Sequence, residues 1–148
     1  MPNKTKISWT ELSSNPLYVV RKSDGKRGWH CVHAGLDCDR CYAELLNGRW
    51  GTGFTYTAEF TDKVEWRLNR KELDAIRKIH EPHLIFLGDM IDLHADFVPY
   101  SLLVEVYEAM LDADWHIFQV QTKRPHNMAA FVDDFGDLPS HIWAGTSC

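Results

Sequence analysis

Short apolar runs alternate with longer, helically patterned stretches along the second half of the chain. His83–Gly88 is a compact apolar run of the kind that a fully buried parallel strand shows, and Trp115–Gln121 and His141–Gly145 are predicted as further strands. Between them, apolar residues recur at helical spacing, which predicts two helices. We expect these helices to bury Leu103, Val106, Tyr107 and Met110 in the first, from about Pro99 to Leu111, and Met128, Phe131 and Val132 in the second. Strand and helix repeat at intervals of roughly 25–35 residues, which predicts parallel βαβ units and an α/β fold.

The first half of the chain has weaker signals. Ile7–Thr10 alternates apolar and polar residues and Leu17–Val20 is a short apolar run, so either can be the first strand of the fold. Tyr56–Phe60 also has strand character. Thr61 is a suitable N-cap for a helix that we expect to continue to about Ile79, because the apolar residues of that stretch fall on one stripe.

Three of the four cysteines lie close together, with the spacing Cys-x6-Cys-x2-Cys at Cys31, Cys38 and Cys41. We interpret residues 28–44 as a cysteine loop that leads into a helix, since apolar residues recur at helical spacing from Asp39 onward. Cys41 is then expected in the first helical turn. Unpaired N–H groups and the positive end of the helix dipole stabilise a thiolate at that position.

The composition limits what these thiols can do. A chain of 148 residues, 45% hydrophobic and 25% charged, is the size of one globular domain, here residues 1–148. No apolar run approaches the roughly 20 residues that cross a bilayer, and the N-terminus lacks the features of a signal peptide. We therefore expect a cytoplasmic protein with no membrane partner. Thiols stay reduced in that compartment, which favours metal binding or catalysis over disulfides.

Two kinds of metal centre suit three thiolates on one loop. The thiolates can hold a [4Fe–4S] cluster by three of its irons and leave the fourth iron open to a ligand. With His30 or His33 as a fourth ligand, they can instead close a zinc site. The residues alone leave both alternatives open.

Unusual polar residues follow each predicted strand of the second half. Because functional residues collect at the carboxyl ends of parallel strands, we expect these residues to meet the cysteine loop at one site. They are Asp89, Asp92 and His94 after the first strand, Thr122, Lys123 and Arg124 after the second, and Thr146 and Ser147 after the third.

The net charge of −5 argues against binding of nucleic acid over the whole surface. The stretch just before the first cysteine is nevertheless basic, since Arg21, Lys22, Lys26 and Arg27 outnumber Asp24. Such a cluster can contact phosphates beside the cysteine loop. The alternative interpretation is a solvated turn.

Five ordered motifs cover nearly the whole chain. They are Ile7–Thr10, the Cys-x6-Cys-x2-Cys-Tyr-Ala-Glu loop, Met90-x-Asp92-Leu93, Gln119–Pro125 and Leu138-Pro139-x-x-Ile142-Trp143-x-Gly145. Together they resemble the phage-encoded gene-product thirty-seven/sixty-eight family, a domain of unknown function that is similar to radical S-adenosylmethionine (SAM) proteins. The resemblance implies a partial (β/α) barrel with mainly parallel strands and a [4Fe–4S] cluster on the loop after the first strand.

The resemblance also implies a chemistry for the cysteine loop. Cys31, Cys38 and Cys41 would bind three irons, and the open iron would take the amino and carboxylate groups of SAM. Reductive cleavage of SAM would then release a 5′-deoxyadenosyl radical that abstracts hydrogen from a substrate. The phage context and the basic cluster point to nucleic acid or a nucleotide as that substrate.

The polar turns would contact the cofactor. Asp89 or Asp92 would accept hydrogen bonds from the amino group or ribose hydroxyls of SAM. Lys123 or Arg124 would pair with its carboxylate, with Thr122 in the same turn. Asp92 and Lys123 are our candidate catalytic residues.

The sequence departs from the pattern of radical-SAM proteins in two respects. The first gap of the cysteine motif has six residues where those proteins have three, and Arg40 stands where an aromatic residue is expected. The chain is also shorter than members of the resembled family, so we expect a truncated barrel or a second chain that completes it. The alternative function is therefore a non-catalytic phage protein that holds zinc or a relict cluster, acts through a partner chain, and resides in the host cytoplasm. The open last strand would provide an edge for such a partner.

Overall fold

The computed structural model describes residues 2–34, 38, 41–49 and 53–146. Its larger sheet has the strand order β1-β2-β6-β7-β8. The strands are β1 (Asn3–Lys4), β2 (Leu12–Ser14), β6 (Leu84–Leu87), β7 (Ile117–Thr122) and β8 (Ile142–Thr146). β1 is antiparallel to β2, whereas β2, β6, β7 and β8 pair in parallel. The predicted α/β class with mainly parallel strands is confirmed, and the described strands form an open sheet rather than a closed barrel.

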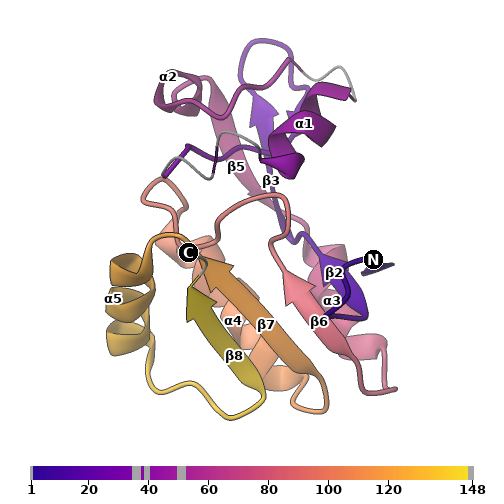
Figure 1. Ribbon diagram of the computed structural model, residues 1–148. Helices are drawn as coiled ribbons and strands as arrows, with labels where there is room; N and C mark the ends of the chain where they lie inside the picture. The colour runs from indigo at the N-terminus through magenta and orange to yellow at the C-terminus, as the bar shows by residue number, and fades with distance from the viewer. Residues whose placement is uncertain (1, 35–37, 39–40, 50–52, 147–148) are drawn as a thin grey trace.

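Three helices connect successive parallel strands. They are α3 (Arg70–Lys78), α4 (Tyr100–Asp112) and α5 (Pro125–Phe135). In Figure 1, α3 and α4 lie behind the sheet and α5 lies beside β8. Proline suits the first turn of α5, because its missing N–H would have no partner there.

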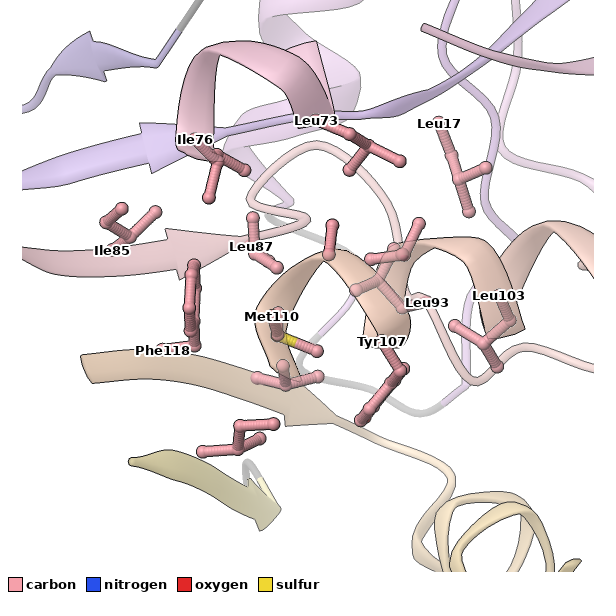
Figure 2. Close-up of a cluster of buried hydrophobic side chains, with 14 of the residues drawn as sticks. Leu17, Leu73, Ile76, Ile85, Leu87, Leu93, Leu103, Tyr107, Met110 and Phe118 are labelled. Carbon is pink, nitrogen blue, oxygen red and sulfur yellow. The ribbon is translucent and has the colours of Figure 1, made fainter. Parts of the chain in front are cut away.

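The main core lies between the sheet and these helices. Figure 2 shows side chains of α3, β6, α4 and β7 meeting in one cluster, among them Ile76, Leu87, Met110 and Phe118, which are each at most 1% exposed. The four residues predicted to line the buried side of α4 are all buried, as are Met128 and Phe131 of α5. The apolar periodicity of the second half therefore identifies the core-facing residues correctly.

A smaller unit is inserted between β2 and α3. It contains β3 (Leu17–Arg21), β4 (Arg27–Gly28), α1 (Tyr42–Arg49), α2 (Ala58–Thr61) and β5 (Val64–Leu68). The three strands form an antiparallel sheet in the order β4-β3-β5. A small core of Val19, Phe54, Phe60 and Val64 holds this unit together. In Figure 1 the unit lies beyond the ends to which the arrows of β6 and β7 point.

Three sequence predictions in the first half are wrong. Ile7–Thr10 is not a strand, and the first parallel strand is neither of the two candidates but β2, which pairs with β6 from Leu12↔Ile85 to Ser14↔Leu87. Tyr56–Phe60 is no strand, because its last residues belong to α2. The expected long helix from Thr61 is split into β5 and α3. Val64–Leu68 alternates buried and more exposed residues and pairs with β3, which stabilises it as a strand.

No helix in the described part of the chain combines the length and apolar character needed to cross a membrane.

Candidate functional site

A cavity of about 450 Å³ lies where the cysteine loop meets the carboxyl ends of the parallel strands. The cysteines and the candidate cofactor-binding and catalytic residues all line this one cavity: Cys31, Cys38, Cys41, Asp89, Asp92, Thr122, Lys123 and Arg124. They come from segments far apart in the sequence, which the strand order brings to one end of the sheet. The expected convergence of these residues is therefore present in the fold.

The cysteine loop is stabilised by short-range hydrogen bonds. The Cys41 N–H donates to the Cys38 carbonyl at 3.1 Å, and the Ala34 N–H donates to Cys38 Sγ at 3.3 Å. Cys41 immediately precedes α1, and its carbonyl accepts from the Leu45 N–H at 3.2 Å. It therefore lies at the helix N-terminus, one position before the predicted first turn.

Cys31 is half-buried, and its thiol donates to the Val32 carbonyl at 3.6 Å. Burial raises the pKa of this thiol, because the thiolate loses hydration there. Cys38 is buried and Cys41 is half-buried. All three are free thiols in the described structure.

Asp89 follows β6 through Gly88, whose φ of +79° turns the chain sharply into the site. One Asp89 carboxylate oxygen accepts a hydrogen bond from the Asn15 side chain. The Tyr42 hydroxyl donates to the Asp89 carbonyl at 2.7 Å, which links α1 to this turn. Burial raises the pKa of the Asp89 carboxyl, although the Asn15 hydrogen bond opposes this shift.

Asp92 has both carboxylate oxygens occupied by protein donors. One oxygen accepts from the Thr122 hydroxyl at 2.7 Å and the His94 N–H at 3.0 Å. The other accepts from the Lys123 N–H and from Arg124 Nη1, both at 3.0 Å. Asp92 therefore ties the turn after β6 to the end of β7.

Both histidines proposed as a fourth zinc ligand are hydrogen-bonded to other side chains. His30 is fully buried, and its Nε2 is hydrogen-bonded to the Thr61 hydroxyl at 2.8 Å. His33 Nε2 is hydrogen-bonded to a Glu44 carboxylate oxygen at 2.6 Å. Among the described residues, no group of three or more His, Cys, Asp or Glu side chains is arranged to hold a single metal ion.

Two other residues of the predicted convergence do not line the cavity. His94 is buried beside the core, with Nε2 hydrogen-bonded to the Tyr107 hydroxyl at 2.7 Å. Thr146 is exposed at the end of β8 and is not in the cavity wall. Ser147 lies outside the described residues.

One residue beside the cavity, and several in its wall, were not selected from the sequence. Asn15 donates to Asp89 and accepts from the Met90 N–H at 3.1 Å, so it connects the ends of β2 and β6. No signal in the sequence marked it, because the three-residue strand β2 that precedes it was not predicted. Trp9 lines the cavity, 43% exposed, with its ring against Phe86 at a centroid distance of 4.9 Å.

The basic cluster forms the turn between β3 and β4. An ion pair of 2.6 Å joins Arg21 to Asp24, and the Arg27 guanidinium lies over the Tyr18 ring at 3.9 Å from its centroid. Lys22 and Lys26 are exposed. None of the cluster's four cations lines the cavity.

Comparison with known proteins places the chain in a family. No curated protein and no solved structure matches the chain significantly. The family model described as "Protein of unknown function (DUF5131)" matches residues 4–148, which is nearly the whole chain. The chain therefore belongs to the DUF5131 family of proteins of unknown function.

Proposed function

We propose that this chain binds a [4Fe–4S] cluster through Cys31, Cys38 and Cys41 and cleaves SAM reductively, as a radical-SAM-type enzyme built on a partial (β/α) barrel. One observation carries the proposal. The three thiols share a cavity of about 450 Å³ with a half-buried carboxyl group at Asp89 and a basic residue at Lys123. Cavities of this size are typical of small-molecule sites.

The cysteine loop suits a cluster. Each thiolate of a cluster bonds to a different iron, so the three sulfurs have to face one space but need not surround one atom. The Ala34 N–H donates a hydrogen bond to Cys38 Sγ, as backbone N–H groups do to cluster-bound sulfur. Cys41 lies at the start of α1, a position that suits a metal-bound thiolate. Iron binding would also overcome the raised pKa of Cys31, because a coordinating thiol is deprotonated outright. When bound, the cluster supplies the electron that cleaves SAM.

Asp89 and Lys123 are our candidates for holding the amino acid part of SAM. The half-buried Asp89 carboxylate would accept from the SAM ammonium group, and this positive charge would compensate the partial burial that now raises its pKa. Lys123 would pair with the SAM carboxylate. Asp92 and Thr122 are hydrogen-bonded to each other. We therefore assign them to stabilising the turns after β6 and β7 rather than to contacting SAM.

The placement of the histidines favours the cluster over zinc. A structural zinc site needs four ligands around one ion. His30 is bonded to Thr61 inside an aromatic core and His33 is paired with Glu44, so recruiting either would break an existing contact.

Anaerobic reconstitution with iron and sulfide tests the proposal. We expect about four irons per chain and a visible absorption that dithionite bleaches, followed by SAM-dependent formation of 5′-deoxyadenosine and methionine. Cys38→Ser and Cys41→Ser should lose the cluster, whereas Cys148→Ser, outside the loop, should keep it. Stoichiometric zinc without a cluster would refute the proposal.

A second candidate is a non-catalytic metal-binding protein that acts through a partner chain. The observation that favours it is β8, whose residues from Trp143 to Thr146 are all exposed and which pairs only with β7 among the described strands. An unpaired strand edge of this kind can accept a strand from another chain. Sedimentation of the reconstituted protein that shows a stable complex, together with no SAM cleavage, would favour this candidate.

Nucleic acid is the substrate class that we propose for the enzyme. The exposed Lys22, Lys26 and Arg27 of the β3–β4 turn support this choice. Retention of a single-stranded oligonucleotide should fall steeply with salt and should weaken in Lys22→Glu/Lys26→Glu. Binding that does not depend on salt would contradict it.

A further inference from the structure

One side chain joins the cysteine loop to the carboxyl ends of the parallel strands. Arg124, just after β7, donates from Nη2 to the Val32 carbonyl at 2.7 Å and from Nη1 to Asp92 at 3.0 Å. Val32 directly follows Cys31, and the same Val32 carbonyl accepts from the Cys31 thiol. The guanidinium therefore bridges the turn after β6 and the backbone beside the first cysteine.

This bridge is largely shielded from water. The side chain of Arg124 is 12% exposed and that of Asp92 is 9% exposed. Hydrogen bonds between charged groups are strong where water does not compete, and a guanidinium offers two donors in a fixed plane. Asp92 is itself held by Thr122, the His94 N–H and the Lys123 N–H. Asp92, which is fixed by groups at the ends of β6 and β7, therefore determines where the Arg124 guanidinium lies.

The other two cysteines are positioned differently. Cys38 and Cys41 are held by local hydrogen bonds within the loop, from the Cys41 N–H and the Ala34 N–H. Neither of these bonds includes Cys31 or Val32. The hydrogen bond from Arg124 to the Val32 carbonyl instead joins the backbone next to Cys31 to the end of β7.

We propose that Arg124 is a positioning residue, which holds the Cys31–Val32 segment against the ends of β6 and β7 so that Cys31 faces the cavity before any metal binds. The guanidinium contacts neither the cluster nor SAM in this role. It acts through the Val32 carbonyl and through Asp92. The consequence for cluster binding rests on the function proposed above, whereas the placement of Cys31 is a property of the metal-free chain.

Thiol alkylation of the reduced, metal-free chain tests this role directly. Iodoacetamide labelling of Cys31, Cys38 and Cys41 is followed by peptide mass spectrometry in the wild type, Arg124→Gln, Arg124→Lys and Arg77→Gln. Arg77 is the matched control, because it lies on helix α3, pairs with Asp112 at 2.8 Å and does not line the cavity. Loss of this charge-assisted hydrogen bond from Arg124 should raise Cys31 labelling at least about tenfold.

The expected pattern is selective. Cys31 labelling rises strongly in Arg124→Gln. It rises less in Arg124→Lys, which keeps the positive charge but lacks the two donors of the guanidinium. Labelling of Cys38 and Cys41 changes little in both variants. Arg77→Gln behaves as the wild type. Unchanged Cys31 labelling in a folded Arg124→Gln or Arg124→Lys chain overturns the proposal, and so does an equal rise at all three cysteines. Circular dichroism establishes folding, and Arg124→Lys provides the test if Arg124→Gln does not fold.

Reconstitution separates this inference from the proposed function. If the wild type takes up a cluster, Arg124→Gln should hold less iron per chain than Arg77→Gln. Full cluster occupancy in Arg124→Gln with unchanged labelling would overturn the positioning role and leave the proposed function standing. A wild type that binds no cluster would refute the proposed function, while selective Cys31 labelling would still support the role of Arg124.

Discussion

Gly88 holds the turn between β6 and Asp89 in a conformation that a larger residue would strain. Its φ is +79°, and a β-carbon added there would lie 2.8 Å from Leu93 Cγ and 3.3 Å from the Ile91 carbonyl oxygen. The left-handed backbone costs an L-residue about 1–2 kcal/mol. Overpacking against Leu93, which is 1% exposed, adds about 1–3 kcal/mol. We therefore expect Gly88→Ala to lower the free energy of unfolding by about 2–5 kcal/mol.

Gly25 provides the matched control. Its φ of +72° is nearly the same, but a β-carbon there would meet nothing within 4 Å. Gly25→Ala should therefore show only the backbone cost of about 1–2 kcal/mol, partly offset by the lower entropy of its unfolded chain. Urea unfolding of the metal-free chains, followed by circular dichroism, measures both variants, with the urea dependence of the free energy unchanged.

The difference between the two alanine variants isolates the steric clash. A difference below about 0.5 kcal/mol would refute the reasoning, because Leu93 would then have moved at little cost. In a Leu93→Ala background, Gly88→Ala should cost about as much as Gly25→Ala does. The turn also carries Asp89 into the cavity, so Gly88→Ala should weaken SAM binding by the reconstituted protein, whereas Gly25→Ala should not.

Two further predictions concern stability. Burial lowers the pKa of His30 and His94 to about 4 and lowers that of His116, so the unfolded chain takes up protons first, and the free energy of unfolding should fall as the pH drops from about 6.5 towards 4. Urea midpoints at about pH 7 and pH 5 check this, and equal midpoints would contradict it. Phe118→Ala removes a fully buried ring and should cost about 3–5 kcal/mol, whereas Leu45→Ala, at a side chain 64% exposed, should cost about 0.5 kcal/mol or less by the same unfolding assay.

Local sequence patterns were sufficient to predict the secondary structure of the second half of the chain. β6, β7, β8, α4 and α5 all lie where apolar runs and helical periodicity predicted them. Most of these elements bury an apolar stripe or a run of apolar residues, so their composition reflects their environment directly, although β8 is exposed beyond Ile142. The order of strands and helices also predicted that polar residues would meet at the carboxyl ends of the strands.

The secondary structure of the first half was harder to predict from the sequence, because its elements are short and pair with segments that are distant along the chain. β2 has only three residues and is recognisable by its parallel pairing with β6, more than 70 positions away. Val64–Leu68 has apolar residues compatible with either period, and pairing with β3 makes it a strand. Propensity is a weak signal in segments of this length, so tertiary contacts decide their structure.

The sequence by itself determined most of the residues that gather at the candidate site, since strand ends and the cysteine spacing are local features, although His94 and Thr146 were expected there and do not line the cavity. Only the tertiary structure decided which hydrogen-bond partners those residues have. It places Arg124 between Asp92 and the Val32 carbonyl, pairs Asn15 with Asp89, and engages His30 and His33 away from a shared ion. Hydrogen-bond partners of buried polar groups are chosen by proximity in space, and no periodicity along the chain records that proximity.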